Sequence, residues 1–225
     1  MILRDSLFAL AALALAATGA PAAAKPVLDV PPLFHLPPKP PPPRLVFNYR
    51  GWRVDASRTA KTQSPTRTVR AVMAQIDIVE RLGLRPDMLA AMRAQPIIAD
   101  GATNPALEIS GYVPGRGVVL HVRRLDRKKP ALLYGMLKAY MAQRLPGGVA
   151  NQEVAVLRNE AANHHAWPKT ARMLQANDEF FALSGAAYLF GTITREPYTR
   201  ADLRKTEPAC YQWLANLFDG GRARL

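Results

Sequence analysis

Cysteine, acidic residues and long apolar runs are all scarce in this chain of 225 residues. Cys210 is the only cysteine, so no disulfide bond can form within the chain. We expect Cys210 to be a partly buried helix residue; a reactive thiol or a disulfide-linked dimer is the alternative. After the first 24 residues, no apolar run approaches the roughly 20 residues that a membrane-spanning helix needs. The sequence therefore excludes an internal disulfide framework and a membrane span in the body of the chain.

The N-terminal residues differ in composition from the rest and predict two segments. Residues 1–24 have the pattern of a signal peptide: Arg4 at the charged end, an apolar run at 7–17 and small residues at 22–24. An uncleaved membrane anchor is the alternative, although the apolar run is short for one. Residues 25–43 contain nine prolines and predict a stiff, extended Pro-rich linker. We therefore predict an exported protein, either periplasmic or secreted.

The shortage of acidic residues leaves a strongly basic chain. Seventeen Asp and Glu stand against 30 Lys and Arg, which gives a formal net charge of +13. This surplus favours acidic partners such as anionic lipid, a polyanionic envelope polymer or an acidic protein, and nucleic acid is not expected outside the cytoplasm. The charges occur as many short pairs, such as Arg123–Arg124 and Arg204–Lys205, so a merely solubilising surface is the alternative.

Residues 44–220 are expected to form one α+β domain. Strands are expected at 44–57 with a break at Gly51, at 97–99, and at 107–113 and 117–122, the last two joined as a hairpin. Helices are expected at 67–82, 86–94, 130–146, 151–165, from 177 to about 190, and at 207–218. Strands followed by helices predict a small mixed or antiparallel sheet and a helical C-terminal half.

The helix expected at 130–146 has an unusual centre. Its apolar residues recur at helical spacing, while Tyr134 and Lys138 stand four residues apart and therefore share a face. Gly135 follows Tyr134, and a glycine inside a helix costs about 1 kcal/mol relative to alanine. Something other than helix stability therefore determines the residue at this position.

Several short motifs resemble the C-terminal half of the anthrax-toxin lethal-factor-like zinc metallopeptidase family. They are LLxxMLxAY at 132–140, NDEFFA at 177–182, YLFG at 188–191, REPYTRADL at 195–203 and PxxYxWLxxLF at 208–218. The resemblance extends loosely back to Gly51. It implies the zincin-like fold of a metallopeptidase catalytic domain.

The resemblance also assigns site positions. In this family, one helix carries His-Glu-x-x-His, whose histidines bind zinc and whose glutamate is the general base, and a later glutamate is the third ligand. Tyr134 and Lys138 match the two histidines, Gly135 the general base, Glu179 the third ligand and Tyr188 a tyrosine near the site. Only one ligand position survives, so we expect no bound zinc, no other cofactor and no hydrolysis by this mechanism.

We hypothesise that a polar cluster replaces the metal site. The Lys138 ammonium would neutralise the Glu179 carboxylate, which would otherwise be buried at a cost of several kcal/mol. Tyr134 would donate a hydrogen bond to the same carboxylate, and Tyr188 is grouped with this cluster by the resemblance. The alternative is that Lys138 extends to solvent and Glu179 is exposed.

The function expected from these features is that of an exported, catalytically inactive peptidase-like protein, a pseudoenzyme whose cleft binds a peptide or protein or serves regulation. One alternative is a metal-dependent peptidase with a rearranged site that uses His121, His164 or His165 with Glu179. Adjacent histidines on a helix point about 100° apart, which does not suit a shared ion. The other alternative is a basic envelope-binding module.

Overall fold

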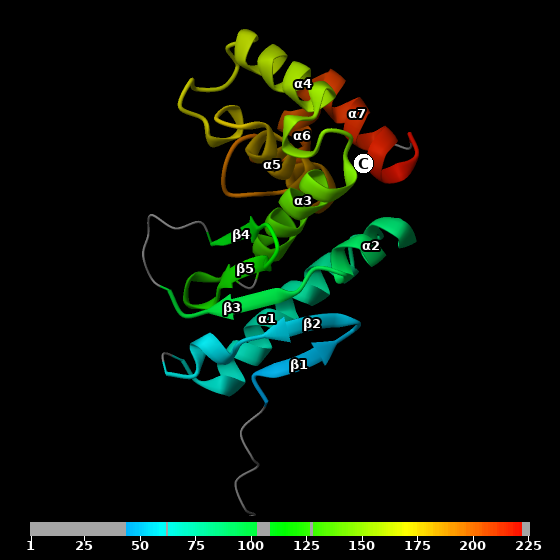
Figure 1. Ribbon diagram of the computed structural model, residues 1–225. Coiled ribbons are helices and arrows are strands. Elements are labelled where there is room, and N and C mark those ends of the chain that lie inside the picture. The colour runs from blue at the N-terminus through cyan, green and yellow to red at the C-terminus, as the bar shows by residue number, and fades with distance from the viewer. Residues whose placement is uncertain (1–43, 62, 103–108, 127, 222–225) are drawn as a thin grey trace, which may run out of the picture. The chain divides into compact units, whose positions relative to one another are not determined.

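A computed structural model describes residues 44–61, 63–102, 109–126 and 128–221 (Figure 1). The predicted signal peptide and Pro-rich linker fall within residues 1–43 and lie outside the described residues. The described residues all belong to one compact unit. Among the described helices, none combines the length and the apolar character that crossing a bilayer requires.

The described strands form one mixed sheet in the order β1-β2-β3-β5-β4. They are β1 Val46–Tyr49, β2 Trp52–Asp55, β3 Ile97–Asp100, β4 Ser110–Val113 and β5 Gly117–His121. The hairpins β1–β2 and β4–β5 are antiparallel, whereas β3 runs parallel to both β2 and β5. Alternate residues of β2 and β3 are buried, so one face of the sheet lies in the core.

Two helices connect β2 to β3, and the carboxylate of Glu80 links them to the sheet by hydrogen bonds. These helices are α1 Pro65–Glu80 and α2 Pro86–Arg93. The indole of Trp52 is fully buried and donates a hydrogen bond to Glu80 at 2.6 Å. Arg93 of α2 donates two hydrogen bonds to the same carboxylate, at 3.0 and 2.6 Å. One glutamate therefore joins β2, α1 and α2.

Helix α3 (Ala131–Arg144) lies between the sheet and the C-terminal helices (Figure 1). It contacts β4 and β5 on one side and α5 on the other, and Leu132, Leu133 and Met136 are fully buried. Gln75 of α1 is also fully buried and accepts a hydrogen bond from the Leu132 amide at 3.0 Å. This contact satisfies one of the free amides at the start of α3 and fixes where the helix begins.

Four further α-helices lie in the described part of the C-terminal half. They are α4 Gln152–Asn163, α5 Asn177–Phe190, α6 Arg200–Thr206 and α7 Pro208–Asp219. From Glu179 to Leu189 every residue of α5 is buried, which makes α5 the second core helix beside α3. Its aromatic side chains pack against those of α7, as in the edge-on pair Phe181–Trp213, whose ring centroids lie 5.9 Å apart.

The predicted α+β class, with a small sheet followed by a helical half, is confirmed. Two details differ from the sequence-based expectation. The described part of the strand expected at 107–113 begins at Ser110, and α6 was not expected at all. Cys210, expected to be partly buried, is only 2% exposed, and burial raises the pKa of its thiol to about 12.

Candidate functional site

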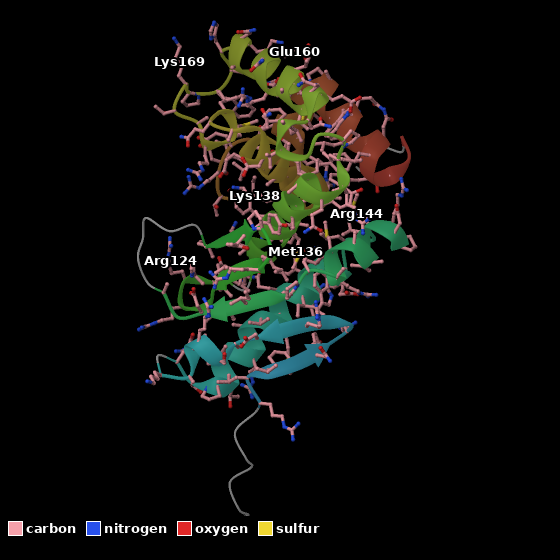
Figure 2. All side chains as sticks on the ribbon, viewed as in Figure 1. Arg124, Met136, Lys138, Arg144, Glu160 and Lys169 are labelled. Carbon is pink, nitrogen blue, oxygen red and sulfur yellow. The ribbon has the colours of Figure 1, made fainter. Side chains whose placement is uncertain are left out.

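The centre of α3 faces the first turn of α5. Tyr134 and Lys138, one turn apart on α3, both reach the carboxylate of Glu179 on α5. The Tyr134 hydroxyl donates a hydrogen bond to Glu179 Oε2, and Lys138 Nζ donates to Oε1 at 2.6 Å. The Lys138 ammonium also lies 5.0 Å from the centre of the Tyr134 ring, within cation–π range. The structure thus brings these three residues together across two helices that are far apart in sequence (Figure 2 labels Lys138).

Two further charged residues complete this site, and sequence reasoning missed both. Arg172 lies in the short helix η4 (Arg172–Leu174) and donates a hydrogen bond to Glu179 Oε1 at 2.6 Å. Asp178, next to Glu179, forms an ion pair with Lys138 at 3.0 Å. The group Tyr134, Lys138, Arg172, Asp178 and Glu179 is called the carboxylate cluster below. It contains two cations and two carboxylates, so its charges balance.

Burial and hydrogen bonding act in opposite directions on Glu179, whose side chain is 5% exposed. Burial alone would raise the pKa of its carboxyl, but the hydrogen bonds from Arg172, Lys138 and Tyr134 outweigh it and lower the pKa below its ordinary value of 4.5. Glu179 is therefore ionised at neutral pH. Because both of its oxygens already accept strong hydrogen bonds, the carboxylate is poorly placed to act as a base or to bind a metal ion.

The glycine in the middle of α3 is required by close packing on the sheet. A Cβ at Gly135 would clash with Ser110 Oγ of β4 and would lie 2.6 Å from Val118 Cγ1 of β5. Both neighbours belong to strands against which α3 packs. The position that the resemblance assigns to a general base therefore faces the sheet and has no room for a glutamate side chain.

Replacing Gly135 with alanine is expected to destabilise the protein, although alanine favours a helix by about 1 kcal/mol. The clash with Ser110 and Val118 should cost about 1–3 kcal/mol and exceed that gain. The double variant Gly135→Ala/Ser110→Gly should recover part of the loss, because the nearest clashing atom is gone. Urea unfolding of the three proteins measures this, and a single variant as stable as the wild type would contradict the packing argument.

Tyr188 does not belong to the carboxylate cluster, contrary to the grouping made from the resemblance. It stands nine residues after Glu179 on α5, about 13 Å further along the helix at 1.5 Å per residue. Its hydroxyl donates a hydrogen bond to Asp219 at 2.6 Å, and its ring packs against Tyr211 with centroids 5.1 Å apart. Tyr188 thus joins α5 to α7 in the core and does not approach the site.

The described histidines lie outside the carboxylate cluster, and two of them have acidic partners there. His121 pairs with Asp100 at the ends of β5 and β3, and His164 pairs with Glu207 at 3.0 Å. His165 follows α4 and is exposed, with a positive φ of 52°. Within the described part of the chain, no three His, Cys, Asp or Glu side chains are grouped so that they could hold a metal ion. This arrangement gives no support to a rearranged metal site built from these histidines and Glu179.

The residues of the carboxylate cluster do not fit zinc. A tetrahedral zinc site takes neutral imidazole, thiolate or carboxylate ligands. Here the ammonium of Lys138 lies 2.6 Å from Glu179 Oε1, and the guanidinium of Arg172 lies at the same distance from that oxygen. A divalent cation at the Glu179 carboxylate would face two positive charges, and nothing at Gly135 could take a proton from bound water.

A cavity of about 210 Å³ opens beside the carboxylate cluster. Tyr134, whose hydroxyl contacts Glu179, also forms part of its lining. The remaining walls come from the start of β4, the loop before α3, the middle of α5 and the loop after α5. The cavity is therefore built on the two core helices, and it is the space where a ligand could meet the site.

Comparison with known proteins does not assign the chain to a family. No protein-family model matches the chain, and no curated protein matches it. Among solved structures, the chain is similar to the PRO-PRO endopeptidase PPEP-2 from Paenibacillus alvei. The TM-score is 0.48 and the identity 20%, over 67% of this chain and 89% of that one. The function proposed below therefore depends on the residues of this chain alone.

Acid is expected to weaken the fold through Glu179. Since its pKa is lowered in the folded protein, its contribution to stability is complete above the ordinary value of 4.5 and is lost as the pH falls through the folded pKa. The free energy of unfolding should then decrease by up to about 1.4 kcal/mol per pH unit for this one proton. Urea unfolding between about pH 3 and pH 7 measures the slope.

The matched variant for this prediction is Glu179→Gln. Burial would raise the pKa of Glu80, but hydrogen bonds from Arg93 and Trp52 lower it, so the wild-type curve alone does not isolate Glu179. The difference between the wild-type and Glu179→Gln curves isolates Glu179, because Glu80 titrates in both proteins. Parallel curves below about pH 5 would contradict the assignment to Glu179.

Proposed function

We propose that this chain is a non-catalytic binding protein: an exported, zincin-like, peptidase-like domain whose cavity beside Tyr134 receives a peptide or a segment of another protein. One observation carries the proposal. Glu179, at the position of the third ligand in the resemblance, is held by hydrogen bonds from Tyr134, Lys138 and Arg172. A carboxylate held in this way stabilises the structure, and the hydrolytic machinery has no base.

The export part of the proposal is supported only by the sequence pattern of residues 1–24. The binding part is supported by the position of the cavity. Its walls come from α3 and α5, which also carry the carboxylate cluster, so the cluster holds the cavity in shape. A rigid, largely pre-formed concavity lined by apolar side chains with a few polar groups is what small ligands and peptide ends require.

Zinc content and peptide cleavage test the absence of catalysis. The purified protein is dialysed against excess zinc and then against buffer, and zinc is measured by elemental analysis. The same sample is incubated with a mixed peptide library, and cleavage is followed by mass spectrometry. We expect little zinc and no cleavage above background. About one zinc ion per chain, together with cleavage that a chelator abolishes, would overturn the proposal.

A control variant assigns any zinc that is retained. Glu179→Ala removes the only carboxylate that the resemblance places as a ligand. Zinc that persists in this variant is bound elsewhere, for example at the His121–Asp100 pair, and leaves the proposal standing. Zinc that is lost with Glu179 is bound at the carboxylate cluster and contradicts it.

A further inference from the structure

The loops that form the rim of the cavity beside Tyr134 are fixed by hydrogen bonds. Before α3, the amide of Gln75 donates to the backbone carbonyls of Asp126 and Lys129 at 3.1 and 2.8 Å. After α5, the Ile193 amide donates to the Tyr198 carbonyl at 2.7 Å, which folds residues 193–198 back on themselves. The side chains on both loops are therefore presented to the cavity from a stable backbone.

Charge is distributed unevenly in this lining. Among the described residues that line the cavity, Arg124, Lys129 and Arg195 are cationic and Asp126 is acidic. The Asp126 carboxylate also accepts a hydrogen bond from the Lys128 amide at 2.9 Å. No ion pair to a described residue neutralises the ammonium of Lys129 or the guanidinium of Arg195. The cavity is therefore suited to an anion.

Below the charged rim, much of the described lining is apolar. Pro130, Leu183, Ala186 and Ile193 are all buried residues that line the cavity. The lining also contains polar side chains, and one of them, Ser110, is 2% exposed and has a hydroxyl without a hydrogen-bond partner among the described residues. A buried hydroxyl without a partner costs about 1–3 kcal/mol, so an additional acceptor in this cavity would relieve an existing deficit.

The size of the cavity limits what it can hold. About 210 Å³ is less than the roughly 300–1,000 Å³ of pockets for drug-sized ligands. It therefore suits one or two residues of a peptide, with an apolar side chain against Leu183 and Ile193 and the charged group at the rim. A cationic or purely apolar segment would leave Lys129 and Arg195 without a counter-charge.

We propose that this cavity binds a carboxylate of a peptide together with a neighbouring apolar side chain. The inference rests on the proposed binding function and specifies its ligand. The carboxylate can come from the C-terminus of a peptide or from an acidic side chain within it. In either case Lys129 and Arg195 contact the carboxylate, and the apolar walls take up the neighbouring side chain.

Three peptide probes test this inference and separate the two sources. They are acetyl-alanyl-alanyl-leucine as the free acid, the same peptide as its amide, and acetyl-alanyl-glutamyl-alanine amide. Each is titrated into the isotope-labelled protein, and amide NMR shifts are followed. We expect the free acid or the glutamyl peptide to shift Ser110, Ala131, Ala186 and Ile193, and the leucine amide to bind at least tenfold more weakly. Binding should also weaken as salt is added.

Charge-removing variants give the sharper control. Lys129→Gln and Arg195→Gln should each weaken binding of the acid probe about fivefold, the effect of losing one partly exposed ion pair. Lys169→Gln removes an exposed lysine that does not line the cavity and should leave binding unchanged. Equal binding of acid and amide, equal effects of all three variants, or no shift with any probe would overturn the inference.

These outcomes are distinct from failure of the proposed function. An acid probe that binds here and is then cleaved in a zinc-dependent manner overturns the non-catalytic proposal but leaves the carboxylate preference intact. An amide probe that binds as tightly as the acid, without cleavage, overturns the carboxylate preference but leaves the non-catalytic proposal intact. The library experiment above and the probe titrations therefore decide the two proposals separately.

Discussion

Replacing Lys138 with methionine is expected to lower the free energy of unfolding by about 3 kcal/mol, because it leaves the buried Glu179 carboxylate with less compensating charge. The Lys138 and Glu179 side chains are 13% and 5% exposed, so the pair lies in a largely water-excluded site. Methionine keeps most of the apolar stem, and the change therefore removes mainly the charge. Arg172 and Tyr134 still contact Glu179, which places the effect at the lower end of the range for broken buried pairs.

A matched substitution separates this effect from loss of any lysine. Lys169 is exposed and extends away from the ribbon in Figure 2, so Lys169→Met should change stability by no more than about 0.5 kcal/mol. Urea unfolding at pH 7 measures both variants. Adding Glu179→Gln to Lys138→Met should recover part of the loss, since the unpaired charge is removed. If Lys138→Met and Lys169→Met were equally stable, the carboxylate cluster would have no structural importance.

Replacing Tyr134 and Lys138 together with histidine is expected to create a zinc site at the carboxylate cluster. Both side chains already end at the two oxygens of Glu179. Histidine is shorter than either, so its ring nitrogens would stop short of the carboxylate and leave space for an ion with bonds of about 2 Å. Two imidazoles four residues apart on a helix, with Glu179 opposite, form a three-ligand set. Arg172 would still donate to Glu179 Oε1, so the ion would bind Oε2, which Tyr134 no longer contacts.

The double variant should retain about one zinc ion per chain after dialysis, against little for the wild type. Zinc at about 100 times its Kd should stabilise it by about 2.7 kcal/mol in thermal unfolding. No peptide cleavage is expected, because Gly135 offers no base and cannot be enlarged against Ser110 and Val118. The control Tyr134→Phe/Lys138→Leu keeps side chains of similar size without ligands, and equal zinc in both variants would refute the geometry.

Only some of the residues in the carboxylate cluster were predicted from the sequence. Glu179 and the two α3 positions were found because a motif resemblance aligned them, although 41 to 45 residues separate them. Arg172 belongs to no such motif, and Asp178 lies within the NDEFFA motif but was assigned no role by the resemblance. Asp178 is adjacent to Glu179, yet only the packing of α5 against α3 makes it a partner of Lys138. An ion pair between helices depends on their separation and rotation, which the sequence does not encode locally.

Gly135 and Tyr188 also have surroundings that the sequence did not predict. The glycine was marked as unusual for a helix, but its reason, the close approach of Ser110 and Val118, needed the position of β4 and β5. Tyr188 matched a residue of the resembled family, but in this chain Tyr211 and Asp219, both on α7, determine its position. A match in a motif gives a residue's place in the chain, whereas its neighbours follow from the packing of other elements.

The sequence by itself determined the local structure. Apolar spacing and the proline and glycine positions indicated α1, α2, α3, α5 and α7 and the β4–β5 hairpin, because those signals act between residues a few positions apart. Only the tertiary structure decided that β5 lies between β3 and β4, that five residues from three segments form the carboxylate cluster, and that two loops enclose a basic cavity beside Tyr134. These features depend on contacts between distant segments, whose geometry is fixed only when the helices pack on the sheet.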